Sequence, residues 1–241
     1  MATLLLRLAA PMQSWGIDSK FETRRTMREP SKSGVIGLLA AALGCKRDKL
    51  PDFLRRLQMT VRVDQEGQIT EDFHAVHGID ADEMGRIPLD KDGKPKSTKK
   101  RDFITYRDYL CDAVFLVALQ SDEEEQLAEL ADALAHPAFP LFLGRRSCPP
   151  TLPLLLGVFP DNAQALLKRY PWRASEIYKR KHRGEDLRII SDCPANAALH
   201  SGRRDAPITF HPGKRIFGMR AVTESAILVN NETEHDAFQD L

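Results

Sequence analysis

The sequence lacks any apolar run of the roughly 20 residues that a membrane-spanning helix requires. The leucine-rich stretch from Met1 to Leu8 is too short for a secretory signal and lacks a cleavage pattern. The four cysteines are far apart and show no C-x-x-C spacing, which argues against a zinc site or a disulfide scaffold. These absences predict a soluble, cytoplasmic protein with reduced thiols and no membrane partner.

Motifs for catalysis and cofactor binding are missing as well. There is no Gly-rich nucleotide loop, no G-x-S-x-G elbow and no H-E-x-x-H helix. His74 and His77 are separated by two residues, but no acid or cysteine accompanies them on a helix, so a structural role is favoured over metal ligation. We therefore expect no metal and no other cofactor.

A large excess of charge of one sign is also absent. The 35 lysines and arginines nearly balance 34 acids, giving a net charge of +1 over 241 residues. Any binding of nucleic acid must therefore depend on local clusters of basic residues. With 42% hydrophobic residues, the chain can bury the core of one or two domains.

The first basic cluster is the stretch Leu143-Gly144-Arg145-Arg146-Ser147-Cys148-Pro149. The glycine permits a tight turn, and the double proline that follows prevents a helix from continuing. Two guanidinium groups and a hydroxyl on a rigid turn suit a phosphate-sugar backbone. The alternative is a surface turn whose arginines cap a neighbouring helix.

The second cluster is a loop of four basic residues and one acid, Glu29, a local excess of +3 (4 − 1). The basic residues are Arg24, Arg25, Arg28 and Lys32. The loop leads into an apolar helix predicted over 35–43, with Ser31 or Ser33 as the N-cap and Gly44 after its end. Free N–H groups and the helix dipole would favour an anion there. Alternatively, the arginines form a solvated face.

The order of the predicted elements indicates the fold. Strands are expected over 3–9, 60–64, 113–119 and 152–159, and helices over 35–43, 48–58 and 121–134, the last with a Ser121 cap. Apart from the short helix 48–58, this order is the β-α-β-β-α-β ferredoxin-like unit that RNA-recognition domains also use. We assign it to residues 1–160 of an α+β protein.

A long insertion interrupts this unit at about residues 73–108. Its middle part, 91–101, holds six basic residues and one acid. It is flanked by Phe73-His74-Ala75-Val76 and Phe103-Ile104-Thr105-Tyr106, so it could form a projecting β-hairpin with a basic tip.

The remainder is predicted to be a small β-rich domain over 161–222, with a helix over 161–170 and strands over 187–190 and 215–220, followed by an acidic tail at 223–241. Seven basic residues in 168–183 alternate with aromatic residues and could bind single-stranded nucleic acid or form a solvated loop. Tyr178, Lys181 and His182 could also catalyse metal-free RNA cleavage, although their spacing is unspecific.

Four motifs together resemble one known family. They are Leu8-Ala9-Ala10-Pro11-Met12-Gln13-Ser14-Trp15-Gly16; Pro30-x-x-Ser33-Gly34-x-x-Gly37-Leu38-Leu39; Tyr106-Arg107-x-Tyr109-Leu110-Cys111-Asp112-Ala113; and Leu143 to Pro149. The sequence is similar to the CasD family, the subunit of the type I-E CRISPR surveillance complex, Cascade, that holds the 5′ handle of the guide RNA (crRNA). The similarity covers residues 1 to about 160.

The resemblance implies an RNA-recognition-like domain with a projecting thumb. It implies a subunit that grips the crRNA handle, caps the filament of backbone subunits and neighbours the large subunit that reads the PAM, with target DNA close by. The implied RNA-binding residues are Gln13, Arg24, Arg25, Arg28, Lys32, Ser33, Arg107, Arg145, Arg146 and Ser147. The implied thumb includes His74, Lys96, Lys99, Lys100 and Arg101.

We therefore expect a non-catalytic RNA-binding subunit of a ribonucleoprotein complex for antiviral defence. Relatives in type I-C systems cut the guide precursor, so a metal-independent endoribonuclease using Tyr178, Lys181 and His182 is one alternative. The other is a protein-interaction module without direct RNA contact, which the near-neutral net charge allows.

Overall fold

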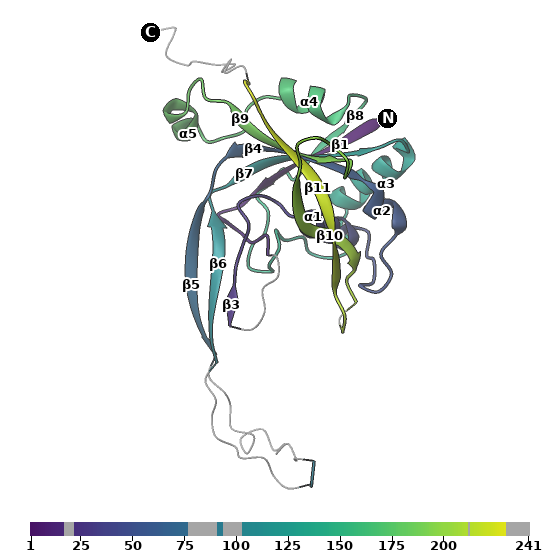
Figure 1. Ribbon diagram of the computed structural model, residues 1–241, viewed down its shortest axis with the longest axis vertical. Helices are drawn as coiled ribbons and strands as arrows, with labels where there is room; N and C mark the ends of the chain where they lie inside the picture. Colours follow the sequence, from purple (N-terminus) through teal and green to yellow (C-terminus); the bar gives the residue numbers. More distant parts are fainter. Residues whose placement is uncertain (17–21, 77–90, 94–102, 212, 230–241) are drawn as a thin grey trace.

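The computed structural model describes residues 1–16, 22–76, 91–93, 103–211 and 213–229. Within these ranges the protein has two β-sheets, with helices against the faces of the larger one (Figure 1). The predicted α+β class, with mainly antiparallel pairing, is confirmed. The predicted tip lysines, Lys96, Lys99 and Lys100, and Arg101 lie outside the described residues.

The larger sheet has seven strands in the order β10-β11-β9-β4-β7-β1-β8. Its amino-terminal strands are β1 (Ala2–Ala9), β4 (Gln58–Gln65), β7 (Val114–Ser121) and β8 (Leu155–Phe159). All pairs between them are antiparallel, and β7 lies between β1 and β4 as the continuous apolar run 113–119 predicts. Together with α1 (Lys32–Ala42) and α3 (Glu124–Ala135), these strands occur along the chain in the order β1-α1-β4-β7-α3-β8.

The carboxyl-terminal strands extend the same sheet. They are β9 (Leu187–Cys193), β10 (Ser201–Thr209) and β11 (Ile216–Ile227). β9 pairs with β4, so this part of the chain shares a sheet with the amino-terminal part. Residues Thr223–Ile227, which we placed in the acidic tail, are the end of β11 instead, because their backbone pairs with β9 as far as Leu187.

The smaller sheet forms the predicted hairpin. β5 (Gln68–Val76) and β6 (Phe103–Cys111) pair antiparallel along nine positions and project from the body (Figure 1). Two short strands, β2 (Met12–Gln13) and β3 (Thr23–Arg24), pair with β6, β2 antiparallel and β3 parallel. The hairpin base is thereby joined to the segment between β1 and α1.

Two helices cover one face of the large sheet. α1 (Lys32–Ala42) begins at Ser31, whose hydroxyl accepts from the Gly34 N–H, and ends before Gly44 at φ +71°, as predicted. α3 (Glu124–Ala135) begins after Glu123 rather than Ser121. The Ser121 hydroxyl instead accepts from the N–H of Glu123. Leu4, Leu6 and Leu8 of β1 form the main core with these helices.

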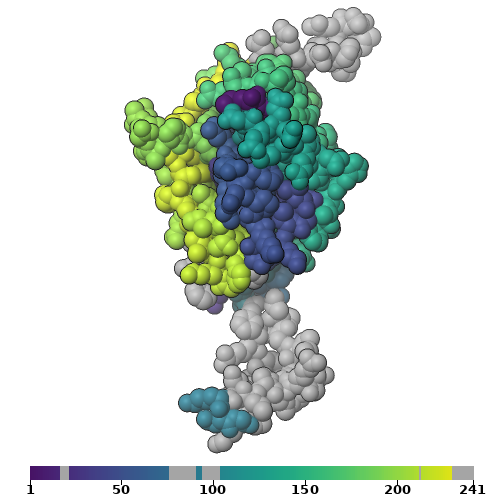
Figure 2. Space-filling model, turned by 90° about the vertical axis from the view of Figure 1, so that its right-hand side faces the viewer, coloured from purple at the N-terminus to yellow at the C-terminus, as the bar shows by residue number. Residues whose placement is uncertain are grey.

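The other helices are short. α2 (Asp52–Arg56) is shorter than the predicted 48–58 because Pro51 cannot lie inside a helix. α4 (Ala163–Arg169) and α5 (Glu176–Lys181) complete the set. α4 packs on the other face of the sheet, where Leu5, Leu116 and Leu166 form a second core. In Figure 2 the yellow carboxyl-terminal strands and the teal segment that includes α3 lie on opposite sides of the body.

Candidate nucleic-acid interface

The Gly144 turn is closed by backbone hydrogen bonds and fixed to the segment after β1. The N–H of Leu143 donates to the Cys148 carbonyl (2.8 Å) and the N–H of Cys148 donates to the Arg145 carbonyl (2.9 Å). Gly144 has φ +86°, and a Cβ there would lie 1.7 Å from the carbonyl oxygen of Ser14. Only glycine permits this approach, so the predicted role of Gly144 in a tight turn is supported.

Arg145 holds the turn against the hairpin base. Its Nη1 donates to the Asp108 carbonyl (3.1 Å) and its Nη2 to the Arg24 carbonyl (3.0 Å). Its guanidinium also lies 4.7 Å from the centroid of the Tyr109 ring, a cation–π distance. Three segments distant in sequence, the turn, β3 and β6, therefore meet at this side chain.

Further basic side chains surround this junction. Arg24 and Arg107 are register partners of β3 and β6; Arg24 is exposed and Arg107 half-buried. Arg25, Arg28 and Arg146 are exposed. Within the described residues, Arg28 and Arg146 make no ion pair or side-chain hydrogen bond, so both can meet an external phosphate. The exposed Ser147 hydroxyl lies 3.3 Å from the Tyr109 hydroxyl.

Two predicted RNA-binding residues have buried side chains that are already bonded to other groups of the protein. Gln13 is fully buried: its Nε2 donates to the Ala113 carbonyl (2.7 Å), and its Oε1 accepts from Trp15 Nε1 (3.0 Å). Lys32 is also buried, and its Nζ lies 2.7 Å from Asp192 Oδ2. The structure gives both residues internal partners, whereas Ser33, in the first turn of α1, stays partly exposed.

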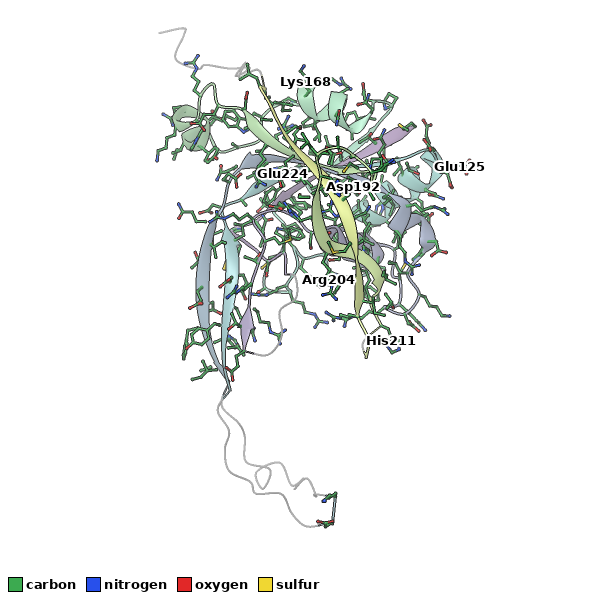
Figure 3. All side chains as sticks on the ribbon, viewed as in Figure 1. Glu125, Lys168, Asp192, Arg204, His211 and Glu224 are labelled. Atoms are coloured by element: carbon green, nitrogen blue, oxygen red, sulfur yellow. The ribbon has the colours of Figure 1, made fainter. Side chains whose placement is uncertain are left out.

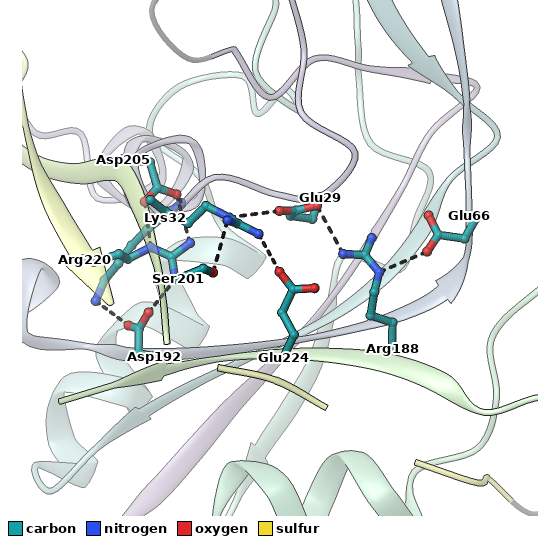
Figure 4. A network of polar contacts seen from close by, with 10 residues as sticks. Glu29, Lys32, Glu66, Arg188, Asp192, Ser201, Asp205, Arg220 and Glu224 are labelled. Carbon is teal, nitrogen blue, oxygen red and sulfur yellow. Dashed lines mark hydrogen bonds and ion pairs between the residues drawn. The ribbon is translucent and has the colours of Figure 1, made fainter. Parts of the chain in front are cut away.

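Lys32 belongs to a polar network that joins the basic loop to the carboxyl-terminal strands (Figure 4). Its backbone N–H donates to Asp205 Oδ2 (2.7 Å), and Arg220 donates to both Asp205 and Asp192 (2.7 and 2.5 Å). Burial by itself would lower the pKa of Arg220, but its hydrogen bonds and charge interactions, Asp205 first and Asp192 next, raise that pKa above its ordinary value. The guanidinium therefore remains charged within the network.

Glu29, the one acid of the basic loop, is directed into the same network. Its carboxylate lies 3.4 Å from Arg188 Nη1 and 3.4 Å from Arg203 Nε. The Glu29 side chain is only 9% exposed. The exposed part of the loop is therefore left with basic side chains and no acid.

The hairpin arms add aromatic surface that our sequence reasoning missed. Phe73 and Tyr106 are register partners, with ring centroids 5.8 Å apart in an edge-to-face arrangement, and are 59% and 39% exposed. Ile104, on the same face, is 44% exposed. The alternation of side chains along a strand could have predicted this surface, because it places Ile104 and Tyr106 on one face of the hairpin. His74 is half-buried on the other face, 3.9 Å from Asp72.

The alternative catalytic set is partly assembled. The rings of Tyr178 and His182 stack with centroids 4.0 Å apart, and His182 Nδ1 lies 2.8 Å from Glu185. The Tyr178 hydroxyl accepts from the backbone N–H of Glu66 (3.3 Å). Lys181 is exposed at the end of α5. Trp172 is buried and its Nε1 donates to the Asp64 carbonyl, so it offers no stacking platform to an RNA.

No group of three or more potential ligands among His, Cys, Asp and Glu that could hold a metal ion occurs in the part of the chain that the structure describes. Over the same residues, no helix combines the length and the apolar character needed to span a bilayer.

An α+β fold with arginines gathered where a closed turn meets a hairpin base defines a candidate nucleic-acid-binding protein. Residues 3–223 match the family model of the CRISPR-associated protein (Cas_Cas5), and the chain belongs to this family. It is 39% identical over 184 residues to the CRISPR system Cascade subunit CasD of Escherichia coli (strain K12), covering 70% of this chain and 77% of that protein. The predicted resemblance is thereby confirmed.

Two solved structures agree with this assignment. A chain of a CRISPR RNA-guided surveillance complex superposes with a TM-score of 0.75 at 33% identity, covering 94% of this chain and 90% of its own. A crystal structure of a Cas protein gives a TM-score of 0.67 at 32% identity, covering 93% and 94%. Both matches include the carboxyl-terminal region, where the sequence alone showed little similarity.

Proposed function

We propose that this protein is a Cascade subunit that grips the 5′ handle of crRNA and caps the filament of backbone subunits. In this proposal it adjoins the large PAM-reading subunit, has target DNA close by and acts in the cytoplasm. Membership of the family and the likeness to CasD support the complex. The observation that carries the RNA contact is the junction at Arg145, which brings the turn, β3 and β6 together among exposed arginines.

The side chains around this junction have different proposed roles. Arg146 and Arg28, exposed and unpaired among the described residues, contact phosphates as guanidinium forks. Arg24, Arg25 and Arg107 add positive charge beside them. Arg145 is a positioning residue, because its donors already hold two carbonyls of the protein. The Ser147 hydroxyl is available to a phosphate or ribose oxygen.

The hairpin is the proposed thumb. The exposed pair Phe73 and Tyr106 offers apolar surface on which an unstacked base can rest, which is how proteins commonly hold single-stranded RNA. Such contacts tolerate any base. We propose that the fold is an RNA-recognition-like, ferredoxin-like core and that residues 161–222 serve as its β-rich extension.

We propose further that the protein does not cleave RNA. The Tyr178 hydroxyl already accepts a backbone N–H, and His182 is held by Glu185 and by stacking on Tyr178. These contacts suit a structural role for the pair at the end of α5. The proximity of the two rings is the observation that favours the endoribonuclease alternative.

The test is binding and cleavage of a repeat-containing guide RNA by the purified chain in chelator, with and without backbone subunits. Handle-dependent assembly with intact RNA is expected. Arg28→Ala with Arg146→Ala should weaken binding and flatten the salt dependence by about 0.7 log-log units per lost phosphate contact. The matched control is Lys168→Ala, at an exposed position on α4 away from the junction (Figure 3).

Two results would contradict the proposal. If the double variant binds RNA like the wild type while partner binding falls, the chain is a protein-interaction module. If the wild type cuts within the repeat without metal, and Tyr178→Phe or His182→Ala abolishes cutting, the chain is a processing nuclease.

A further inference from the structure

A hollow of about 380 Å³ lies on the face of the large sheet opposite α1 and α3. Arg7 of β1 lies on this face, because it alternates with Leu6 and Leu8, which pack toward α1 and α3. The other walls come from Leu152 before β8, from Leu156 within β8, and from α5 and the segment that leads into it. The hollow is separate from the junction around Arg145.

The charged residues that line the hollow are three bases and one acid, an excess of +2 (3 − 1). They are Arg7, Arg173, Lys179 and Glu176. Glu176 is paired with Lys179 at 2.8 Å, so the excess rests on Arg7 and Arg173. Arg7 has a single long hydrogen bond, Nη1 to the Thr151 carbonyl at 3.5 Å.

The nearby carboxylate of Asp64 does not neutralise these two arginines. Both of its oxygens accept from Arg62, at 2.6 and 2.9 Å, and one also accepts from the backbone N–H of Arg173 at 2.7 Å. Arg62 and Asp64 are fully buried and balance each other. Asp64 therefore fixes the backbone at Arg173, a residue that lines the hollow and whose guanidinium lies 5.4 Å from the centroid of the Tyr170 ring.

Arg7 and Arg173 line the same hollow, so their like charges oppose each other. Burial lowers the pKa of Arg7, the charge of Arg173 lowers it further, and Asp64 only partly opposes the two effects. An anion between the guanidinium groups would relieve this repulsion. Guanidinium forks match the oxygens of phosphate, and a phosphate monoester carries up to two charges where a carboxylate carries one.

The remaining wall is apolar. Leu152, Pro153, Leu156 and Trp172 line it, and Leu152 is 77% exposed. A volume of this size lies within the range of small-molecule sites, in which a few polar groups fix the orientation and apolar walls cover the rest of the ligand. The hollow has a cationic part and an apolar part, so a phosphate attached to a sugar and base fits it better than a free inorganic ion does.

We propose that this hollow is a nucleotide-phosphate site, in which Arg7 and Arg173 bind the phosphate and Leu152 and Leu156 cover the sugar or base. Lys179 adds charge at its edge. The site does not depend on the handle-binding proposal, because none of its residues belongs to the junction around Arg145.

The test is titration of the full chain with AMP, with the dinucleotide UpU and with inorganic phosphate, followed by calorimetry and phosphorus NMR. Arg7→Met and Arg173→Met should each weaken binding by about tenfold or more, because a hydrogen bond to a charged group is lost. Lys168→Met is the matched control and should bind like the wild type. Arg173 is exposed, so its variant remains informative if Arg7→Met fails to fold.

The probes distinguish the sources of the phosphate. Preference for AMP over UpU supports a free nucleotide or a chain terminus, and equal binding supports an internal diester of a nucleic acid. Arg146→Ala should leave AMP binding unchanged, whatever its effect on guide RNA. The proposal is overturned if the wild type binds no probe, if acetate binds as well as AMP, or if both arginine variants bind like the wild type.

Discussion

Substitution of Gly144 by alanine tests whether the turn at the centre of the candidate interface has the geometry described. Two costs are expected. The first is the positive φ of +86°, which costs an L-residue about 1–2 kcal/mol. The second is the overlap of the new Cβ with the Ser14 carbonyl oxygen. Gly184 has a similar φ of +82°. Apart from its chain neighbours, no described residue has an atom within 4 Å of the position that an alanine Cβ would take there, so Gly184→Ala measures the first cost by itself.

The overlap can be relieved only by moving the turn away from Ser14. The contact must open from 1.7 Å to at least 3.0 Å, and the turn is held there by the hydrogen bond from the Ser14 N–H to the Leu143 carbonyl (3.1 Å). Overpacking costs about 1–3 kcal/mol and a lost hydrogen bond about 1 kcal/mol. With the φ cost, Gly144→Ala should destabilise the protein by about 3–6 kcal/mol, against about 1–2 kcal/mol for Gly184→Ala.

Equilibrium unfolding in urea measures both variants, with the midpoint expected to fall at an unchanged slope. Guide-RNA affinity gives a second readout, which should fall for Gly144→Ala and stay unchanged for Gly184→Ala. Equal losses of stability in the two variants would refute the reasoning, because they would show that the turn does not lie against Ser14.

Two further sets of substitutions and one pH series test other parts of the structure. Arg62→Met should cost about 3–5 kcal/mol of unfolding free energy, because it leaves the buried Asp64 carboxylate unpaired, and adding Asp64→Leu should restore part of the loss. Gln13→Ala should cost about 1–3 kcal/mol by leaving buried polar partners unsatisfied, with no change in the salt dependence of RNA binding. Burial raises the pKa of the Cys45 and Cys148 thiols. A thiol pKa that is higher in the folded state than in the unfolded state stabilises the protein at a pH below the unfolded pKa of about 8.5, and this stabilisation should be lost as the pH rises through the folded pKa. Urea unfolding midpoints measured from pH 7 upward should show this loss.

Elements that depend on local sequence were predictable. Ser31 and Gly44 mark the two ends of α1 because capping uses side chains within one turn of the helix. The central position of β7 follows from its unbroken apolar run. By contrast, β10 was missed because Ser201–Thr209 contains three consecutive charged residues and a proline, and its register shifts twice along β11.

The site was less predictable because its contacts are distant in sequence. Lys32 is adjacent to exposed arginines in the chain, yet its partners Asp192 and Asp205 lie 160 and 173 residues away. Likewise, Arg145 and Arg146 look equivalent in sequence. They differ because only the first reaches carbonyls of β3 and β6. No local pattern contains this information, since it depends on which strands pair.

The local charge excess predicted for the basic loop is nevertheless unchanged by the burial of Lys32 and Glu29. The network buries Lys32 and Glu29 together, so the exposed loop keeps three bases and no acid, an excess of +3 (3 − 0), equal to the +3 counted in the sequence (4 − 1). Under the proposed function, the attraction of an RNA to this surface depends on that local sum. The positions of the arginines depend on the fold instead, because the contact from Arg145 to the Arg24 carbonyl fixes the turn beside the loop. Folding therefore preserves the local sum of charge, while it separates Arg145, which holds the turn, from the arginines whose side chains remain exposed.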